Sequence, residues 1–177
     1  TIDVGERTAT ETDIDDVLEG FIGGRGVATK LAHERIPFDV DPFGPENRLY
    51  LTTGPMQMSI MSFTGRMSAT AVSPLSTGLA SSNAGGFLSR NFTGAGNAVV
   101  ELTGTSDELL AVHVTDDGVE FEPVPELEGA TVPETTEYMA ETHGLGAEHI
   151  AAIDAAREDL FFFNATMTTE RRAFGRG

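Results

Sequence analysis

The chain has 177 residues, a length that suits one domain and allows about two thirds of the unfolded surface to be buried. It contains no cysteine, which excludes disulfides, thiolate metal sites and cysteine nucleophiles within these residues. Its 28 acidic residues outnumber 11 Lys and Arg and give a formal net charge of -17. Nucleic acids and anionic membranes require clustered cations, so neither is expected as a partner.

The acidity also suggests where the protein works. Dense carboxylates keep a protein hydrated and dispersed in concentrated salt, and the salt screens their mutual repulsion. We therefore hypothesise a halophilic protein from a salt-rich cytoplasm. No apolar run approaches the roughly 20 residues that span a bilayer, and a leader peptide is not expected. A cytoplasmic location is the resulting prediction.

Hydrophobic spacing and turn residues predict strands and short helices in the first half of the chain. Thr12 and Asp15 resemble a capping box that starts a helix, and the glycines of residues 23–26 end it. Val27 and Leu31 are four residues apart on one face of a second helix. The elements expected here are an edge strand over 1–10, helices over 14–21 and 27–35, and strands over 48–51 and 66–73.

The second half of the chain predicts a similar mixture. A helix that starts directly at Gly85 and Gly86 would aim its first N–H groups at a ligand above Asn83. Residues 116–118 (DDG) are the strongest hairpin signal. The elements expected here are a helix over 85–92, a strand over 98–102, hairpin strands over 109–115 and 119–124, a helix over 133–142 and a strand over 160–163. One compact α+β domain is the prediction.

Three separated stretches combine glycine with arginine or asparagine: 64–66 (TGR), 82–86 (SNAGG) and 172–177 (RAFGRG). Glycine lets backbone N–H groups point at an oxyanion, and the arginine fork matches phosphate oxygens. Cationic residues are scarce in this chain, so the arginines placed beside these glycines predict a dianion-binding surface. The alternative is that these arginines pair with carboxylates, which is the commoner use of a surface arginine.

Groups that make or break bonds are not evident in the sequence. The four histidines, His33, His113, His143 and His149, are widely separated, and none has a ligand or nucleophile at a useful spacing. We expect them to be surface or strand residues. Walker-type and dinucleotide motifs and a nucleophile elbow are also missing. No catalytic residue is therefore predicted.

A series of short motifs covers nearly the whole chain in a fixed order. They are 23–28 (GGRGVA), 41–47 (DPFGPEN), 53–55 (TGP), 65–66 (GR), 73–75 (SPL), 82–87 (SNAGGF), 95–96 (AG) and 172–177 (RAFGRG). This ordered set resembles the N-terminal domain of the aldehyde ferredoxin oxidoreductase family. The order of the whole set is far more specific than any one of its glycine motifs.

The resemblance implies a fold of two β-sheets related by a pseudo-twofold, with a few short helices, that forms the base for a bis-pterin cofactor. It implies an enzyme that oxidises aldehydes to carboxylic acids with ferredoxin as electron acceptor. The cofactors implied are tungstopterin or molybdopterin, magnesium that bridges the pterin phosphates, and an iron–sulfur cluster in helical domains beyond this chain. Residues 1–177 are then a single cofactor-base domain, expected to be inactive alone, and a homodimer is compatible with the resemblance.

The same resemblance implies roles for individual residues. The positions that match the family's cofactor-binding motifs are Arg66, Asn83, Gly85, Arg172 and Gly175. Backbone carbonyls of Asn83 and Ala173 match those offered to magnesium, which prefers hard oxygen ligands.

Three places depart from the family's pattern: residues 56–63, Val72, and residues 154–158 (DAARE). The changes around Met56 and Asp154 support an alternative, a non-catalytic relative that serves as a binding or assembly subunit without metal. A plain α+β domain whose arginines pair with carboxylates is the third interpretation.

Overall fold

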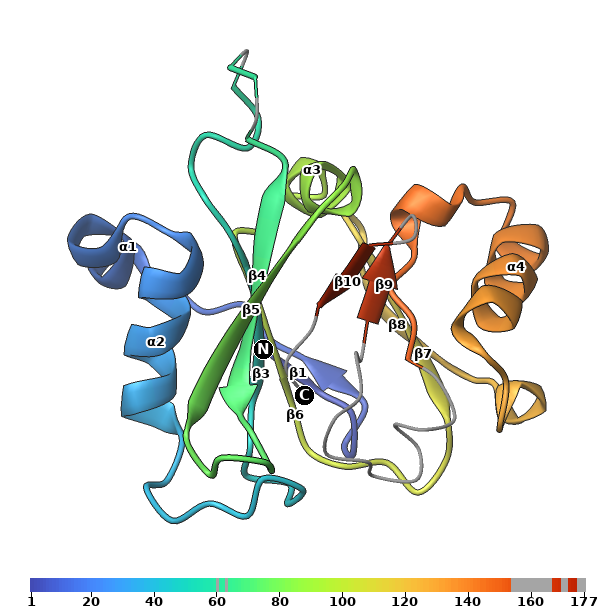
Figure 1. Cartoon of the computed structure of the whole chain (residues 1–177), viewed down its shortest axis with the longest axis horizontal. Helices are drawn as coiled ribbons and strands as arrows, with labels where there is room; N and C mark the ends of the chain where they lie inside the picture. The colour runs from blue at the N-terminus through green and yellow to red at the C-terminus, as the bar shows by residue number, and fades with distance from the viewer. Residues whose placement is uncertain (60, 63, 154–166, 170–171, 175–177) are drawn as a thin grey trace.

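The described part of the chain is built around one six-stranded β-sheet and two β-ribbons (Figure 1). The computed structural model describes residues 1–59, 61–62, 64–153, 167–169 and 172–174. In spatial order the sheet consists of β2 (Thr8–Ala9), β1 (Ile2–Asp3), β6 (Val99–Thr103), β3 (Leu49–Thr53), β4 (Arg66–Val72) and β5 (Leu79–Gly85). Its neighbouring strands are antiparallel, except that β1 and β6 are parallel.

Helices α1 (Asp15–Phe21) and α2 (Gly24–Arg35) cover one face of this sheet (Figure 1). Val27 and Leu31 lie one turn apart on α2, and both are buried against Tyr50 of β3. The predicted common face of Val27 and Leu31 is therefore confirmed. Burial of each aliphatic side chain stabilises the fold by about 1.5–3 kcal/mol.

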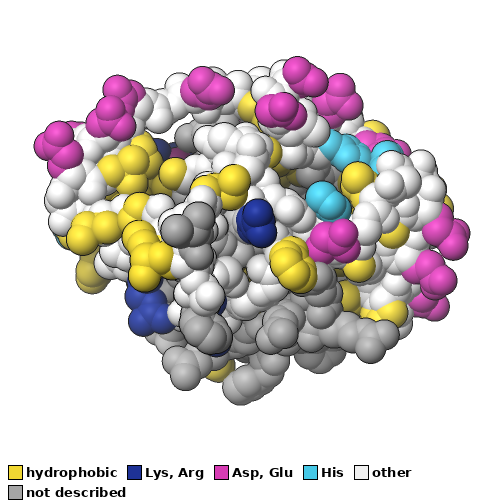
Figure 2. All heavy atoms as spheres, turned by 90° about the horizontal axis from the view of Figure 1, so that it is seen from above, with side chains coloured by type: hydrophobic (Ala, Val, Ile, Leu, Met, Phe, Trp, Pro, Cys, Tyr) yellow, Lys and Arg dark blue, Asp and Glu magenta, His cyan; other side chains and the backbone are white. Residues whose placement is uncertain are grey.

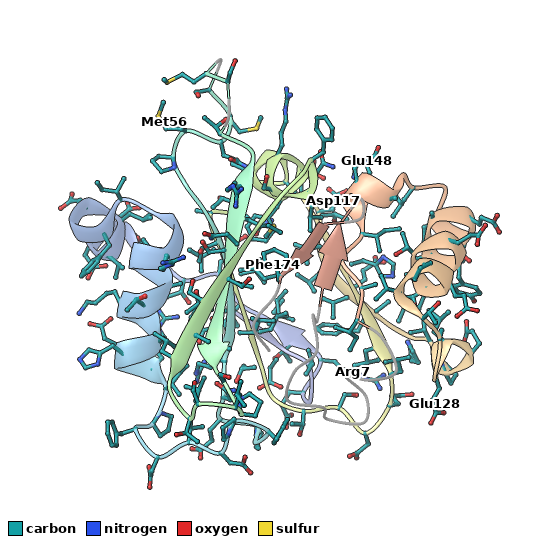
Figure 3. All side chains as sticks on the ribbon, viewed as in Figure 1. Arg7, Met56, Asp117, Glu128, Glu148 and Phe174 are labelled. Carbon is teal, nitrogen blue, oxygen red and sulfur yellow. The ribbon has the colours of Figure 1, made fainter. Side chains whose placement is uncertain are left out.

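The opposite face of the sheet packs against α3 (Leu88–Gly94) and the ribbon of β9 (Met167–Thr169) and β10 (Arg172–Phe174). Phe174 is almost fully buried against Met67 of β4 and Ala84 of β5. Figure 3 shows Phe174 between the sheet and the ribbon. This aromatic contact fixes β10 beside the edge strand β5.

A second β region lies on the other side of the molecule (Figure 1). Strands β7 (Leu110–Thr115) and β8 (Gly118–Pro123) form a hairpin, and helix α4 (Val132–His143) follows a 3-10 turn over Pro125–Leu127. A second 3-10 turn covers Ala147–His149. The hairpin and α4 share a hydrophobic cluster of Val124, Leu127, Met139 and Ile150.

Helix α4 begins with a capping box between Thr131 and Glu134. A Glu134 carboxylate oxygen accepts hydrogen bonds from the Thr131 N–H at 2.8 Å and the Thr131 hydroxyl at 2.6 Å. Replacing Thr131 with Ala should lower the free energy of unfolding by about 1 kcal/mol, because the N-terminal turn loses its cap. Urea unfolding of T131A measures the loss. The exposed mid-helix variant E137A is the control, expected within about 0.5 kcal/mol of wild type, and an equal loss in E137A would refute the cap's role.

A buried carboxylate, Glu101 on β6, joins the sheet to α2 and the chain start. Its oxygens accept hydrogen bonds from Arg35 and Arg48, from the Tyr50 hydroxyl at 3.3 Å and from the Thr1 hydroxyl at 3.1 Å. Burial alone would raise the pKa of Glu101, but the hydrogen bond from Arg48 and the charges of both arginines hold it below its ordinary value. Burial, and then the charge of Glu101, raise the pKa of Tyr50, so its hydroxyl stays protonated as a donor.

The α+β class, with β-sheets and a few short helices, is confirmed. The predicted strands over 48–51, 66–73 and 98–102 correspond to β3, β4 and β6. The hairpin around residues 116–118 and the helix over 133–142 are also present, as β7–β8 and α4. The predicted strand over 160–163 lies outside the described residues. Among the described residues, no helix combines the length and apolar character of a membrane span.

Two predictions near the N-terminus are wrong. Residues 1–10 form two short strands, because Asp3 accepts hydrogen bonds from the N–H groups of Gly5 and Glu6 and turns the chain. The capping box of Thr12 and Asp15 is absent. Helix α1 has Ile14 at its N-cap without a side-chain cap, and Asp13 accepts the Asp15 N–H at 2.8 Å instead.

Two predicted helix starts are also wrong. Helix α2 begins at Gly24 rather than at residue 27, with Gly23 at its N-cap. Residues 79–85 form strand β5, which pairs with β4 along its whole length, and α3 begins only at Leu88. The positive φ of Gly86, 120°, separates the strand from the helix. Pairing with β4 therefore decides the conformation of Asn83 and Gly85.

Candidate functional site

Three of the predicted cofactor-binding residues lie together on β4 and β5. Arg66 is directly opposite Gly85 in the antiparallel ladder, and Ser68 is opposite Asn83. Because opposite residues of such a pair share one face of the sheet, Arg66, Asn83 and Gly85 form one polar area, in which Arg66 and Asn83 are exposed and Gly85 is half-buried. The Asn83 amide nitrogen donates a hydrogen bond to the Ser68 hydroxyl at 2.5 Å, which holds the asparagine against β4.

Helix α2 adds a second cation to this area. The Arg25 guanidinium lies 3.4 Å from the Asn83 side-chain oxygen. Gly23 lets the helix start approach β3 closely, since a Cβ at Gly23 would be 3.0 Å from the Thr53 carbonyl oxygen and 3.1 Å from Pro55. Arg25 was not among the predicted site residues, although its position inside the glycine motif 23–28 is the signal that could have identified it.

The Arg66 side chain is exposed and has no hydrogen-bond or ion-pair partner among the described residues. Arg7, Arg35 and Arg48, which lie outside the three glycine stretches, each bind a carboxylate. Arg66 differs from them, although the chain has a large excess of carboxylates. An unpaired guanidinium beside glycines is suited to an external anion.

The strand ends beside this area are packed closely through their backbones. A Cβ on Gly65 would lie 3.4 Å from the Gly86 carbonyl oxygen, and one on Gly85 would lie 3.6 Å from that of Gly65. The start of β4 and the end of β5 therefore meet backbone to backbone. The first N–H groups of α2 have no side-chain cap at Gly23. Backbone groups and cations at this end can accommodate an anion.

Strand β10, which carries Arg172 and Ala173, lies beside β5, with Cα atoms of the two strands within 8 Å. Phe174 contacts Met67 and Ala84, which alternate with Arg66 and Asn83 along their strands and so point to the other face. Strand β10 thus approaches the area from the side away from α2. Gly175 lies outside the described residues, and the ligand roles of all six predicted residues stay predictions.

An exposed apolar surface lies at the same end of the molecule. Met56, Met58, Met61 and Phe87 are 44%, 58%, 58% and 59% exposed. Figure 2 looks onto this end, where hydrophobic side chains are exposed and acidic ones lie at the margin, and Figure 3 shows Met56 on the loop that precedes β4. Exposed apolar groups of this kind mark contact surfaces rather than core filling.

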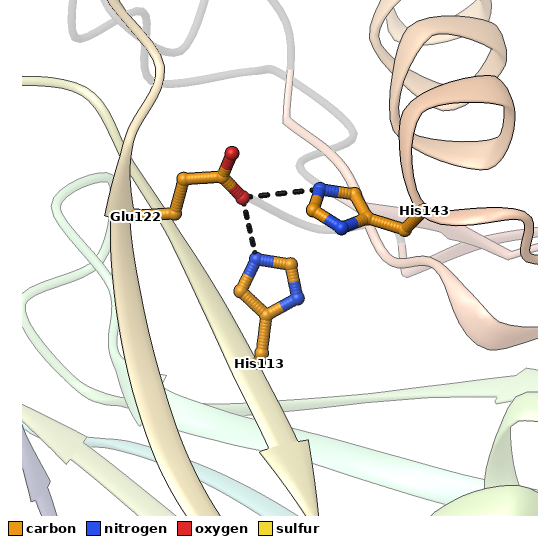
Figure 4. A group of neighbouring side chains, drawn as sticks. All are labelled: His113, Glu122 and His143. Carbon is orange, nitrogen blue, oxygen red and sulfur yellow. Dashed lines mark hydrogen bonds and ion pairs between the residues drawn. The ribbon is translucent and has the colours of Figure 1, made fainter.

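The expectation that no histidine has a ligand-type partner is wrong for two of them, although His113 does lie on a strand as expected. His113 of β7 and His143 of α4 both bind Glu122 of β8, with Nε2 to Oε2 distances of 2.7 and 3.0 Å (Figure 4). In the hairpin His113 is opposite Glu120, which makes Glu122 its diagonal neighbour on one face. The observed register of the hairpin brings His113 to Glu122, and the packing of α4 brings His143 to the same carboxylate.

Two curated relatives with the same description match most of this chain. The chain is 31% identical over 162 residues to the tungsten-containing aldehyde ferredoxin oxidoreductase of Thermococcus kodakarensis, covering 92% of the chain and 27% of that protein. It is 30% identical over 167 residues to the protein of the same description from Pyrococcus horikoshii, covering 94% of the chain and 28% of that protein. The chain therefore spans just over a quarter of these curated relatives.

A solved structure is similar across nearly the whole chain. It is the active site complex BamBC of benzoyl coenzyme A reductase with 1,5-dienoyl-CoA, with a TM-score of 0.91 and 27% identity over 99% of this chain and 27% of that one. The family described as aldehyde ferredoxin oxidoreductase, N-terminal domain, matches residues 1–177. The ordered motifs, the fold and these matches agree, and the chain belongs to the N-terminal domain family of aldehyde ferredoxin oxidoreductases.

Proposed function

We propose that this chain is the cofactor-base domain of a tungsten or molybdenum bis-pterin oxidoreductase. The observation that carries the proposal is the guanidinium of Arg66, which has no ion-pair partner among the described residues and lies beside Asn83 and Gly85 on two paired strands. Family membership supports the assignment, because curated relatives are described as tungsten-containing.

The residues fit the phosphate end of such a cofactor. A guanidinium fork donates to two phosphate oxygens, and nearby backbone N–H groups would add neutral donors. The Asn83 amide, which is hydrogen-bonded to Ser68, would instead keep β5 in place beside Arg66. Arg172 and Gly175 would contribute from the segment that includes β10. Carbonyl oxygens of Asn83 and Ala173 are suited to magnesium, which prefers oxygen ligands.

The cofactor and the residues of this chain would have different roles. When bound, the cofactor supplies oxygen-atom and electron transfer through its metal. The residues of this chain would bind and orient it: Arg66 and Arg25 would neutralise phosphate charge, and β4 and β5 would carry Arg66, Asn83 and Gly85 to the cofactor. The described residues contribute no group that must itself react.

For the whole protein we propose oxidation of aldehydes to carboxylic acids with ferredoxin as electron acceptor. The names of the curated relatives support this reaction. Substrate-binding groups and an iron–sulfur cluster would belong to parts of the protein outside this domain, so the domain alone would be inactive. The exposed surface of Met56, Met58, Met61 and Phe87 is available for packing against those parts.

A second candidate is a non-catalytic relative that acts as a binding or assembly subunit. The exposed methionine loop favours it, since this loop departs from the family's pattern and offers an apolar contact surface.

Elemental analysis of the full-length protein from its native host separates the two candidates. We expect about one tungsten or molybdenum atom per chain, because a bis-pterin site holds a single metal. A protein that contains neither metal, although folded and grown with both, would contradict the enzyme and support the subunit.

A further inference from the structure

We propose that His113, Glu122 and His143 form a binding site for a divalent transition-metal ion of the zinc class, separate from the area of Arg66 and Asn83. Two imidazoles and one carboxylate are a ligand set that zinc accepts, with water in the fourth position. The three residues come from three elements, β7, β8 and the last residue of α4. Nothing in the proposed cofactor-binding function uses them.

The ligand atoms converge on one point. Both imidazole Nε2 atoms are directed at the same Glu122 oxygen, and the candidate ligand atoms all lie within 4.8 Å of one another (Figure 4). In a tetrahedral site with bonds of about 2.0–2.1 Å, ligand atoms are about 3.3 Å apart. The imidazole rings are 4.6 Å apart between centroids and tilted by 58°, so they do not stack. A small outward rotation of the Glu122 side chain would admit the ion.

The supporting elements are rigid enough to preserve this geometry. His113 and Glu122 lie within a continuous six-pair ladder between β7 and β8. Met139 of α4 is buried in a cluster with Val124 and Leu127, which follow β8, and Ala111 of β7 packs against this cluster. The ligands therefore need no large movement before an ion binds.

Access and charge also favour a cation. The side chains of His113, His143 and Glu122 are 21%, 27% and 36% exposed, so an ion and its water can enter from solvent. Among the described residues, Glu122 is paired with these two histidines and with no Lys or Arg. The negative charge of the chain attracts divalent cations to this surface.

An ion bound here would clamp the C-terminal end of α4 to the hairpin. Because the three ligands are adjacent only in the folded state, the binding free energy would stabilise that state. The alternative is a hydrogen-bonded cluster in which Glu122 accepts an N–H from each histidine and no metal binds.

The test is zinc binding by the full-length protein after chelator treatment, measured by competition with a chromophoric chelator. The variants are H113Q, H143Q and E122Q, and the controls are H33Q and H149Q, which remove the two histidines outside the cluster. We expect about one zinc ion per chain at this site. Each cluster variant should bind zinc more than about tenfold more weakly, because mutation of residues that only support metal ligands already lowers metal affinity by that factor. The controls should bind as wild type does.

Two outcomes overturn the proposal: wild type that binds no zinc in this assay, or cluster variants that bind as tightly as wild type. E122Q retains an oxygen acceptor for both histidines, so it should preserve a hydrogen-bonded cluster while weakening metal binding. If a variant misfolds, zinc-edge X-ray absorption of the wild type decides alone. Imidazole scattering from two histidines supports the site, and its absence refutes it. Neither result depends on tungsten content, so failure here leaves the proposed function standing.

Discussion

Replacing Arg66 with Ala should weaken binding of the bis-pterin cofactor by the full-length protein about 10- to 100-fold. The guanidinium is exposed and free of carboxylate partners among the described residues, so its charge is available to a phosphate. Hydrogen bonds to a charged group contribute about 1.5–3 kcal/mol, which corresponds to that range. Tungsten or molybdenum content per chain, measured after dialysis, reports the loss.

Two further variants give this experiment its controls. Arg66→Lys keeps the positive charge but loses the planar fork, and should fall between wild type and R66A. Arg7→Ala removes an arginine that pairs with Glu108, and should retain full metal content. Equal metal content in R66A and wild type would remove Arg66 from the site.

Replacing Glu101 with Ala should destabilise the isolated chain by about 3 kcal/mol. The change leaves Arg35 and Arg48 without their shared partner, and breaking a buried ion pair costs about 3–5 kcal/mol. The lower end applies because the two arginine side chains are 30% and 28% exposed and keep part of their hydration. At about 2–4 °C per kcal/mol for a chain of this size, the melting temperature should fall by about 6–12 °C.

The pH dependence of the same network has a definite sign. Because the pKa of Glu101 is lower in the folded chain than its ordinary value of 4.5, its stabilisation is fully present above pH 4.5 and is lost as the pH falls through the folded-state pKa. The difference in melting temperature between wild type and E101Q should therefore shrink below pH 4.5. A difference that stays constant in acid would show that the Glu101 charge is not responsible.

Sequence patterns predicted those elements whose conformation is determined by residues close together in the sequence. The hairpin of β7 and β8 follows from alternating residues around 116–118, and α2 follows from the spacing of Val27 and Leu31. Strand β5 could not be predicted this way. Its residues, 79–85 (LASSNAG), are small and polar, and they form a strand because β4 supplies a partner of matching length.

The candidate site shows the same limit. The glycine motifs identified Arg66, Asn83 and Gly85, and the structure brings these three together on paired strands. Arg25 joins them only because α2 packs on the same face, and His143 reaches Glu122 only because α4 packs on the hairpin. Contacts made by packing between distant elements leave no periodic signal along the chain.

The most direct test of the central claim is an experimental structure of the full-length protein with its cofactor bound. The account predicts that the guanidinium of Arg66 lies within hydrogen-bond distance of a cofactor phosphate, with Asn83 and Gly85 beside it. A cofactor whose phosphates lie away from β4 and β5 would contradict it.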